Sequence, residues 1–505
     1  MSLKKNILAN YASQLYITLI GIVLVPTYLR YMGPEAYGLV GFFTMLQAWF
    51  QLLDVGLTPT LSRETARFNA GVTDEVSFRR LLSTLELLFI LVAVISFLAM
   101  VVGSDRIATH WLHVEKIPVG DVKVSIILMA GTIAFRWVGG LYRGVINGFE
   151  KFLWISNFNI VISTVKFVVI VPVMIFLGAS PLVFFGYQLA IALVEIMTLF
   201  FRAKKLIPST AEKRTTLVGF RSIKGLLSFS LSIAFTNSIW ILVTQTDKLV
   251  LSKILSLSQY AYFTLGVLVA SAVSVLSGPI SGALLPRMAK MSAAGNDNEL
   301  QLVYGKATQL VTFVVTPIVA MLAFFSKEIL WAWTGDHAVA NNTAPILSMY
   351  AIGNGILAIA AFPYYLQYAK GDLRLHLIGS AVFVAVLAPA LIFLTTNYGV
   401  TGAGYAWVGA NAIYFICWVP LVHRRFFRNF HIHWLLRNVF PSIAVSLACI
   451  VALRHIPVLM VQRFETWVVL FCLGIVVMFA SACGSSYARD LVLAKVFGKF
   501  QREAK

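Results

Sequence analysis

The sequence predicts an all-α membrane protein with about fourteen transmembrane helices and both chain ends in the cytoplasm. Of its 505 residues, 59% are hydrophobic and only 12% are charged, which is about half the charged share of an average soluble domain. The apolar residues form repeated blocks of about twenty, the length of a membrane-spanning helix. These blocks lack the apolar–polar alternation of membrane β-strands, which excludes a barrel.

The apolar blocks set the expected helices in chain order. The first follows Lys4 and Lys5 but is too long for a cleaved signal peptide, so it is expected to stay as a helix. The expected spans are 10–30, 36–57, 81–103, 122–147, 154–178, 181–201, 224–250, 260–285, 304–325, 343–369, 374–394, 401–422, 437–454 and 466–485.

The distribution of basic residues predicts the orientation. With the N-terminus placed in the cytoplasm, most of the 40 Lys and Arg residues fall in cytoplasmic segments, as the positive-inside rule requires. They are scattered over many short loops, a pattern that favours contacts with anionic lipid heads. The net charge of +19 therefore indicates membrane topology, and a nucleic-acid partner is not expected.

A polar connection and a weak internal repeat predict two lobes in parallel orientation. Arg30 lies seven residues before Tyr37, and Lys253 lies seven residues before Tyr260. Repeats of this kind are common in transporters. The predicted domains are an N-lobe at 1–201, a basic cytoplasmic linker at 202–223, a C-lobe at 224–422, and two helices with a basic tail at 423–505.

Five segments resemble a known family of membrane proteins. The opening NYASQLYITLIGIVLVPTYLRYMGPEAYGLVGFF is similar to the start of polysaccharide flippases of the O-antigen type. Four later segments also resemble landmarks of that family: TQTDKLVLSKILSLSQYAYFTLG, GALLPRMAKMSAAGN, EILWAWTG and YGVTGAGYAW. The family belongs to the multidrug/oligosaccharidyl-lipid/polysaccharide exporter superfamily.

The resemblance implies a fold and an activity. The expected fold is two six-helix lobes around a central cavity, with two further helices at the C-terminus. The expected activity is alternating-access transport of an undecaprenyl-pyrophosphate-linked oligosaccharide from the cytoplasmic to the periplasmic leaflet of the bacterial inner membrane. Expected partners are this lipid-linked glycan, the bilayer, polysaccharide polymerase machinery and a coupling ion, H⁺ or Na⁺.

Ionisable residues inside the spans are the candidate substrate-binding residues, because a charge in the bilayer is costly unless it faces protein or water. Arg136 and Arg143 lie seven residues apart and so share one helix face, which Asn147 continues. Asn159 and Lys166 repeat the spacing on the next span. Arg and Lys suit a pyrophosphate, so these five residues are predicted to bind it.

Other charged residues are candidates for a gate or a coupling site. Glu86 and Glu195 lie within spans, and Asp247, Lys248 and Arg30 lie near helix ends. Two readings remain open for the buried charges, because internal ion pairs between the two acids and the two cations at mid-span would neutralise them without any substrate.

Alternative functions differ in the features they require. An ion-coupled drug or solute extruder of the same superfamily would favour an acid-dominated cavity. A membrane glycan polymerase or transferase would need a long loop for its chemistry, and the longest connections, 58–80 and 202–222, are too short. The sequence shows no nucleotide-binding motif and no convincing metal-ligand pattern, so neither an enzyme nor a bound cofactor or metal is expected.

Overall fold

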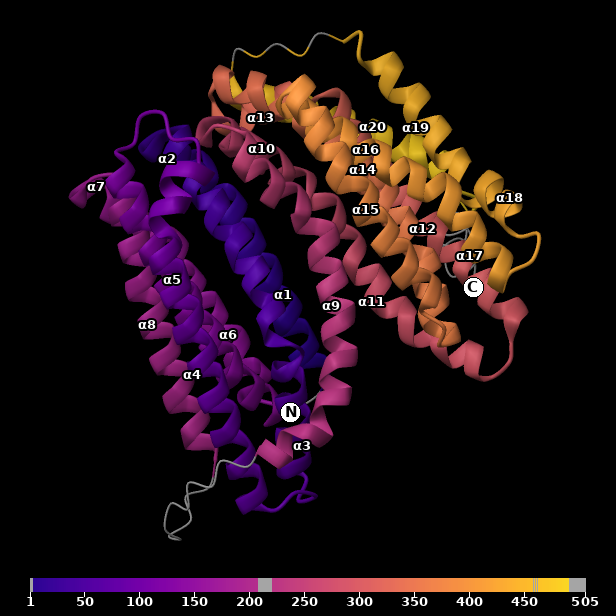
Figure 1. Ribbon diagram of the computed structural model, residues 1–505. Helices are drawn as coiled ribbons and strands as arrows, with labels where there is room; N and C mark the ends of the chain where they lie inside the picture. Colours follow the sequence, from indigo (N-terminus) through magenta and orange to yellow (C-terminus); the bar gives the residue numbers. More distant parts are fainter. Residues whose placement is uncertain (1–2, 208–219, 457, 459, 461, 490–505) are drawn as a thin grey trace, which may run out of the picture. The chain divides into compact units, whose positions relative to one another are not determined.

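The computed structural model describes residues 3–207, 220–456, 458, 460 and 462–489, and these are predominantly helical (Figure 1). Its residues form two compact units, Met1–Ala261 and Tyr262–Lys505. Parts of the predicted linker, 208–219, and of the predicted tail, 490–505, lie outside the described residues. The predicted lobe boundaries stay predictions. Helix α9, Phe220–Ile254, falls at the start of the predicted C-lobe and packs against α2, α3 and α4.

The first unit is built from helices joined by short connections, and its π-turns and one 3₁₀ turn are labelled η. Its elements are α1 Leu3–Val23, α2 Val25–Phe50, η1 Gln51–Asp54, α3 Leu57–Asn69, α4 Glu75–Arg106, η2 Ile107–Trp111, α5 Val119–Gly148, α6 Phe152–Thr164, η3 Val165–Val169, α7 Ile170–Leu177, α8 Pro181–Leu206 and α9 Phe220–Ile254. The next helix, α10 Leu257–Ala270, begins in the first unit and ends in the second.

The second unit continues with further helices, in which the π-turns η4 and η5 prolong the helices before them. Its elements are α11 Ala272–Ala293, α12 Asp297–Phe324, α13 Ser326–Thr334, α14 His337–Lys370, α15 Arg374–Tyr398, α16 Val400–Ile413, η4 Tyr414–Trp418, α17 Val419–Phe426, α18 His431–Trp434, η5 Leu435–Val439, α19 Phe440–Leu453 and α20 Arg463–Gly484.

The prediction of a helical membrane protein is confirmed. All fourteen expected spans fall on helices, with breaks of at most two residues. Twelve helical segments of the described residues are long and apolar enough to cross a membrane. The chain is therefore a multi-pass membrane protein, and the count of fourteen spans stays a prediction.

The first two expected spans meet at a break whose cause is local. Gly33 has φ 79° and ψ 167°, a non-helical conformation inside the segment assigned as α2, and glycine adopts positive φ at little cost. Pro34 follows it and suits the first turn of a new helix. The helical path through α1 and the first part of α2 thus ends before Gly33, which lies between the first two expected spans, 10–30 and 36–57.

Helix α5 is the centre of the first unit. It packs against α3, α4, α6 and α8, and Figure 1 shows α4, α5, α6 and α8 running side by side. Small residues allow these helices to approach closely, as is usual between helices in membranes. At Gly148 an added Cβ would overlap Thr65 Cβ and would lie 2.5 Å from the Ser62 carbonyl oxygen of α3.

We expect Gly148→Ala to destabilise the protein by about 2 kcal/mol, because a backbone carbonyl on α3 cannot yield to the new methyl group. Thermal unfolding of the purified protein in detergent measures this loss. Gly140→Ala is the matched control, since its Cβ would meet only Thr58 Oγ1 at 3.7 Å. Equal unfolding temperatures for the two variants would contradict the close approach of α3 and α5.

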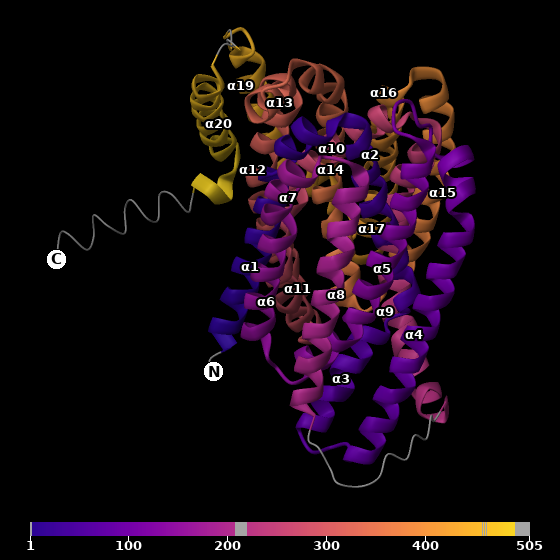
Figure 2. The same ribbon diagram turned by 90° about the vertical axis from the view of Figure 1, so that its left-hand side faces the viewer.

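The last two predicted helices, α19 and α20, pack on each other and on α12 (Figure 2). The buried amide of Gln309 on α12 fastens them. Its Nε2 donates to Asn438 Oδ1 at 2.9 Å and to the Arg437 carbonyl at 3.2 Å. Its Oε1 accepts from the backbone N–H of Tyr487 at 3.0 Å and from Ser486 Oγ at 3.1 Å. This amide is fully hydrogen-bonded, which ties η5, at the start of α19, and the residues that follow α20 to α12.

Candidate functional site

A polar cavity of about 370 Å³ lies within the first unit, among α1, α2, α5, α6, η3 and α8. Its size falls at the lower end of the range of small-molecule sites. Five of the ten predicted site residues line it: Arg136, Arg143, Asn159, Lys166 and Glu195. The candidates from three separate spans are therefore brought together in one place.

The pairing of α5 with α8 positions the two arginines. Arg136 Nη2 donates to Gln188 Oε1 at 2.8 Å, and Arg143 Nη2 donates to Glu195 Oε1 at 2.5 Å. Both pairs are separated by 52 residues along the chain. The two arginines lie seven residues apart on α5, and Gln188 and Glu195 lie seven residues apart on α8, which is about two turns in each helix. The two bonds therefore form on one face of each helix and hold α5 and α8 in register.

Glu195 is the counter-ion of both arginines. Its Oε2 lies 3.7 Å from Arg136 Nε, while its Oε1 receives Arg143. Arg143 also donates from Nη1 to Asn159 Oδ1 at 2.5 Å. With Lys166 also lining the cavity, three cationic side chains and one carboxylate face the same space. The cavity therefore carries a formal charge of plus two.

Two of the cations have hydrogen-bonding capacity to spare. Within the part of the chain that the structure describes, Arg136 Nε and Nη1 are buried without a hydrogen-bond acceptor. Lys166 comes from η3, and its Nζ lies 4.5 Å from the centroid of the Phe167 ring. Among the described residues no carboxylate oxygen lies within 4.0 Å of this ammonium. The buried Arg136 donors without acceptors are costly, and a multivalent anion beside Lys166 would satisfy them.

The ion-pair alternative is only partly realised. Glu195 pairs with the arginines, but Glu86 on α4 pairs with Lys204 at 3.0 Å and is not among the cavity-lining residues. The second acid thus does not neutralise the cavity. An excess of positive charge remains that ion pairing among the described residues of the first unit does not explain.

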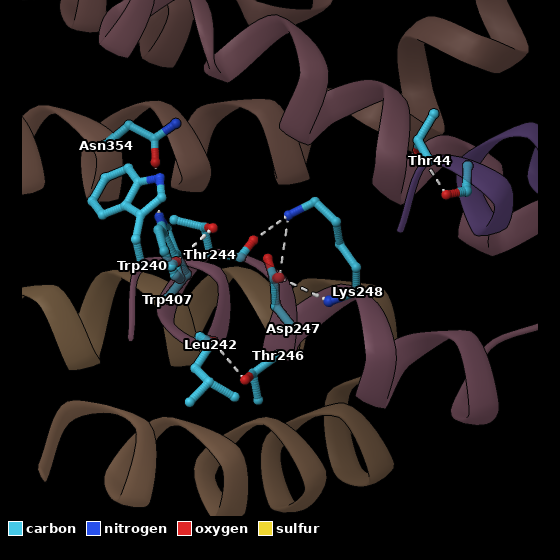
Figure 3. A network of polar contacts seen from close by, with 10 residues as sticks. Thr44, Trp240, Leu242, Thr244, Thr246, Asp247, Lys248, Asn354 and Trp407 are labelled. Carbon is cyan, nitrogen blue, oxygen red and sulfur yellow. Dashed lines mark hydrogen bonds and ion pairs between the residues drawn. The ribbon is translucent and has the colours of Figure 1, made fainter. Parts of the chain in front are cut away.

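The other predicted residues lie elsewhere. Asn147 lies four residues beyond Arg143 and does not line the cavity, and Arg30 is exposed. Asp247 on α9 is buried, with 1% of its surface exposed, and Lys248 Nζ lies 3.2 Å from its Oδ1 (Figure 3). Lys248 Nζ also donates to the Thr244 carbonyl at 2.7 Å. This arrangement satisfies the lysine within its own helix.

Three glutamines of the site were not predicted from the sequence. Gln188 is the buried acceptor for Arg136, and Gln47 and Gln51 line the cavity from α2 and η1. A signal for Gln188 was present, because it precedes Glu195 by seven residues and repeats the spacing of Arg136 and Arg143. Among the described residues, no group of three or more His, Cys, Asp or Glu could hold a metal ion.

Comparisons with known proteins show which protein family the chain resembles. Residues 3–292 match the family model described as polysaccharide biosynthesis protein. A Shigella flexneri protein, named as a candidate O-antigen transporter, is 23% identical, covering 81% of this chain and 94% of that protein. The uncharacterized membrane protein EpsK of Bacillus subtilis (strain 168) is 22% identical, covering 97% and 95%.

Solved structures show the same fold. The inward closed conformation of the lipid II flippase MurJ matches with a TM-score of 0.72 at 16% identity, covering 96% of this chain and 99% of that chain. An inward-facing multidrug resistance transporter of the MATE family matches with a TM-score of 0.63 at 13% identity, covering 81% and 94%. The family model spans more than half of the residues, so the chain belongs to the polysaccharide biosynthesis protein family and has the fold of the MurJ and MATE transporters.

Proposed function

We propose that this protein is a flippase that carries an undecaprenyl-pyrophosphate-linked oligosaccharide across the bacterial inner membrane by alternating access. Transport runs from the cytoplasmic to the periplasmic leaflet, and both chain ends are cytoplasmic. The observation that carries the proposal is the cavity in which Arg136, Arg143 and Lys166 face one carboxylate, Glu195. The named relative in Shigella flexneri supports the class of cargo, and the basic cytoplasmic loops support the orientation.

The pyrophosphate is the part of this substrate that the cavity fits. Its dense negative charge matches the formal charge of plus two, with Arg136 Nε and Nη1 and Lys166 Nζ as its donors. Arg N–H groups make charge-assisted hydrogen bonds to phosphate oxygens and Lys acts as a point charge. The amides of Gln47, Gln51 and Asn159 suit sugar hydroxyls beside it, and the polyprenyl chain stays in the bilayer.

A coupled extruder of drugs or solutes is the competing function, because the fold is shared with MATE transporters. Its cargo is most often cationic or neutral, and a cavity with three cations and one acid disfavours it on electrostatic grounds. The proposal also includes a coupling ion and a polysaccharide polymerase partner. Its candidate gate or coupling residues are Asp247, Lys248, Arg30, Glu86 and Glu195.

We expect the double variant Arg136→Ala, Lys166→Ala to bind an isoprenoid diphosphate about 100-fold more weakly than the wild type. Each charge-assisted contact contributes about 1.5 kcal/mol or more, and 1.4 kcal/mol corresponds to a tenfold change. Titration of farnesyl diphosphate into the protein in nanodiscs measures the dissociation constant, and cells that rely on the variant should accumulate lipid-linked oligosaccharide.

The matched control is Lys204→Ala, which removes a cation of the same unit that pairs with Glu86 outside the cavity. Its affinity should equal that of the wild type. Wild-type affinity and glycan export in the double variant would overturn the proposed site, and impaired drug resistance with normal glycan export would favour the extruder.

A further inference from the structure

Lys166 does not come from an ordinary α-helix. It is the second residue of the π-turn η3, Val165–Val169, which lies between α6 and α7. A π-turn inserts one extra residue into the helix and is frequently found at functional sites. Its position decides which side chains of this span face the cavity, since each residue advances the helix by about 100°.

Three side chains from other helices bond three consecutive carbonyls of this turn. Tyr187 Oη donates to the Val165 carbonyl at 2.7 Å, and Tyr28 Oη donates to the Phe167 carbonyl at 2.6 Å. Between them, Gln188 Nε2 donates to the Lys166 carbonyl at 3.3 Å. Two donors come from α8 and one from α2, so the turn is held from two sides.

Pro172 lies three residues beyond the turn, in the first turn of α7. Proline has no N–H and its ring clashes with the carbonyl four residues earlier, here that of Val168. The α-helical ladder is therefore weakened at this turn. Side chains from α2 and α8 bond the carbonyls of Val165, Lys166 and Phe167 and stabilise the wider turn.

Gln188 connects this turn to Arg136 on α5. Its Nε2 bonds the Lys166 carbonyl while its Oε1 accepts from Arg136 Nη2. The side chain is 2% exposed, so both halves of one buried amide are used. One residue thus fixes the backbone of one cation and the guanidinium of another.

We propose that Tyr28, Tyr187 and Gln188 are positioning residues that hold the π-turn and thereby direct Lys166 into the cavity. The inference rests on the proposed role of Lys166 in binding the pyrophosphate. When the three bonds are lost, the turn relaxes toward α-helical register and the residues on one side of it rotate by about 100°. The Lys166 ammonium then turns away from the cavity.

The test uses the double variant Tyr28→Phe, Tyr187→Phe, which keeps both rings and removes both hydroxyls. Tyr16→Phe is the matched control, because Tyr16 Oη bonds Thr164 Oγ1 at 2.6 Å, one residue before the turn and on a side chain. The first readout is the affinity for farnesyl diphosphate in nanodiscs. We expect about a tenfold loss for the double variant, comparable to loss of one charge-assisted contact, and none for the control.

The second readout reports geometry. Lys166→Cys, made in a chain whose four native cysteines are replaced, is labelled with a water-soluble methanethiosulfonate reagent. We expect labelling to slow at least fivefold when both tyrosine hydroxyls are absent and to be unchanged in Tyr16→Phe. In a Lys166→Ala background, the tyrosine changes should weaken diphosphate binding no further, because coupled residues are not additive.

The outcomes distinguish failure of the proposed site from failure of the positioning role. If Lys166→Ala binds farnesyl diphosphate like the wild type, the proposed pyrophosphate site fails. If Lys166→Ala weakens binding but the tyrosine variant labels and binds like the wild type, the site stands and the positioning role is overturned. An equal affinity loss from the tyrosine changes with and without Lys166 would also overturn it, since that loss would be general.

Discussion

Glu195→Ala is expected to lower the free energy of unfolding by about 3 kcal/mol. The change removes the carboxylate that both Arg136 and Arg143 contact, at 3.7 and 2.5 Å, and leaves three cations in one cavity. Breaking a buried ion pair by removing one partner typically costs about 3–5 kcal/mol. The low end applies because 26% of the Arg143 side chain is exposed. Thermal or denaturant unfolding in detergent measures the loss.

Glu86→Ala is the matched control for Glu195. It also removes an acid inside a span, but its partner Lys204 is 44% exposed, and exposed pairs contribute about 0–1 kcal/mol. If both variants lose the same stability, the arginines do not depend on Glu195. Inorganic pyrophosphate offers a second measurement, because a ligand that binds the folded state raises stability. It should stabilise Glu195→Ala more than the wild type, since the anion takes the place of the missing carboxylate.

The sequence was sufficient to predict the helices and the polar residues that could meet. Runs of apolar residues located the spans, and the seven-residue spacing placed Arg136 with Arg143 and Asn159 with Lys166 on shared faces. Both pairs do line one cavity. These features depend on hydropathy and helix periodicity, which are local properties of the chain.

The choice of partners was not predictable, because it depends on the register between helices. From the sequence, both Glu86 and Glu195 were candidate counter-ions, and of the two Glu195 lies where α8 faces the arginines of α5. Gln188 was not predicted because a neutral amide costs less in a span than a charge does, although its seven-residue spacing from Glu195 gave a signal. The π-turn at Lys166 had one local sign, Pro172, but its location also depends on Tyr28 and Tyr187 from other helices.

Glu35→Ala is expected to produce a second loss of about 3 kcal/mol, at a different place in the first unit. Glu35 follows the break at Gly33 and is 6% exposed. Its Oε1 accepts the backbone N–H of Glu115 at 2.6 Å, and both of its oxygens accept the N–H of Lys116 at 3.0 Å. Hydrogen bonds to a charged group contribute about 1.5–3 kcal/mol each, and alanine would leave these N–H groups unpaired.

Hydrogen–deuterium exchange of residues 115–117 gives the direct measurement. Their amides should exchange faster in Glu35→Ala, with an intermediate effect in Glu35→Gln, whose Oε1 still accepts while its Nε2 cannot. Glu115→Ala is the control, because among the described residues that side chain accepts only from Ser258 Oγ at 3.3 Å. Unchanged protection at 115–117 in Glu35→Ala would show that the loop is held by other contacts.

The contact between Glu35 and the 115–117 loop also links that loop to the cavity. It ties the part of α2 that follows Gly33 to the segment that leads into α5, and these two helices carry Gln47 and Arg136. Glu35 and Gln47 are twelve residues apart, about 18 Å along a helix, so the carboxylate does not reach the cavity itself. Loss of this contact should therefore reduce stability far more than affinity for farnesyl diphosphate. The double variant Arg136→Ala, Lys166→Ala should instead reduce that affinity far more than stability. Opposite profiles in these two variants would distinguish the residues that support the fold from those that bind the anion.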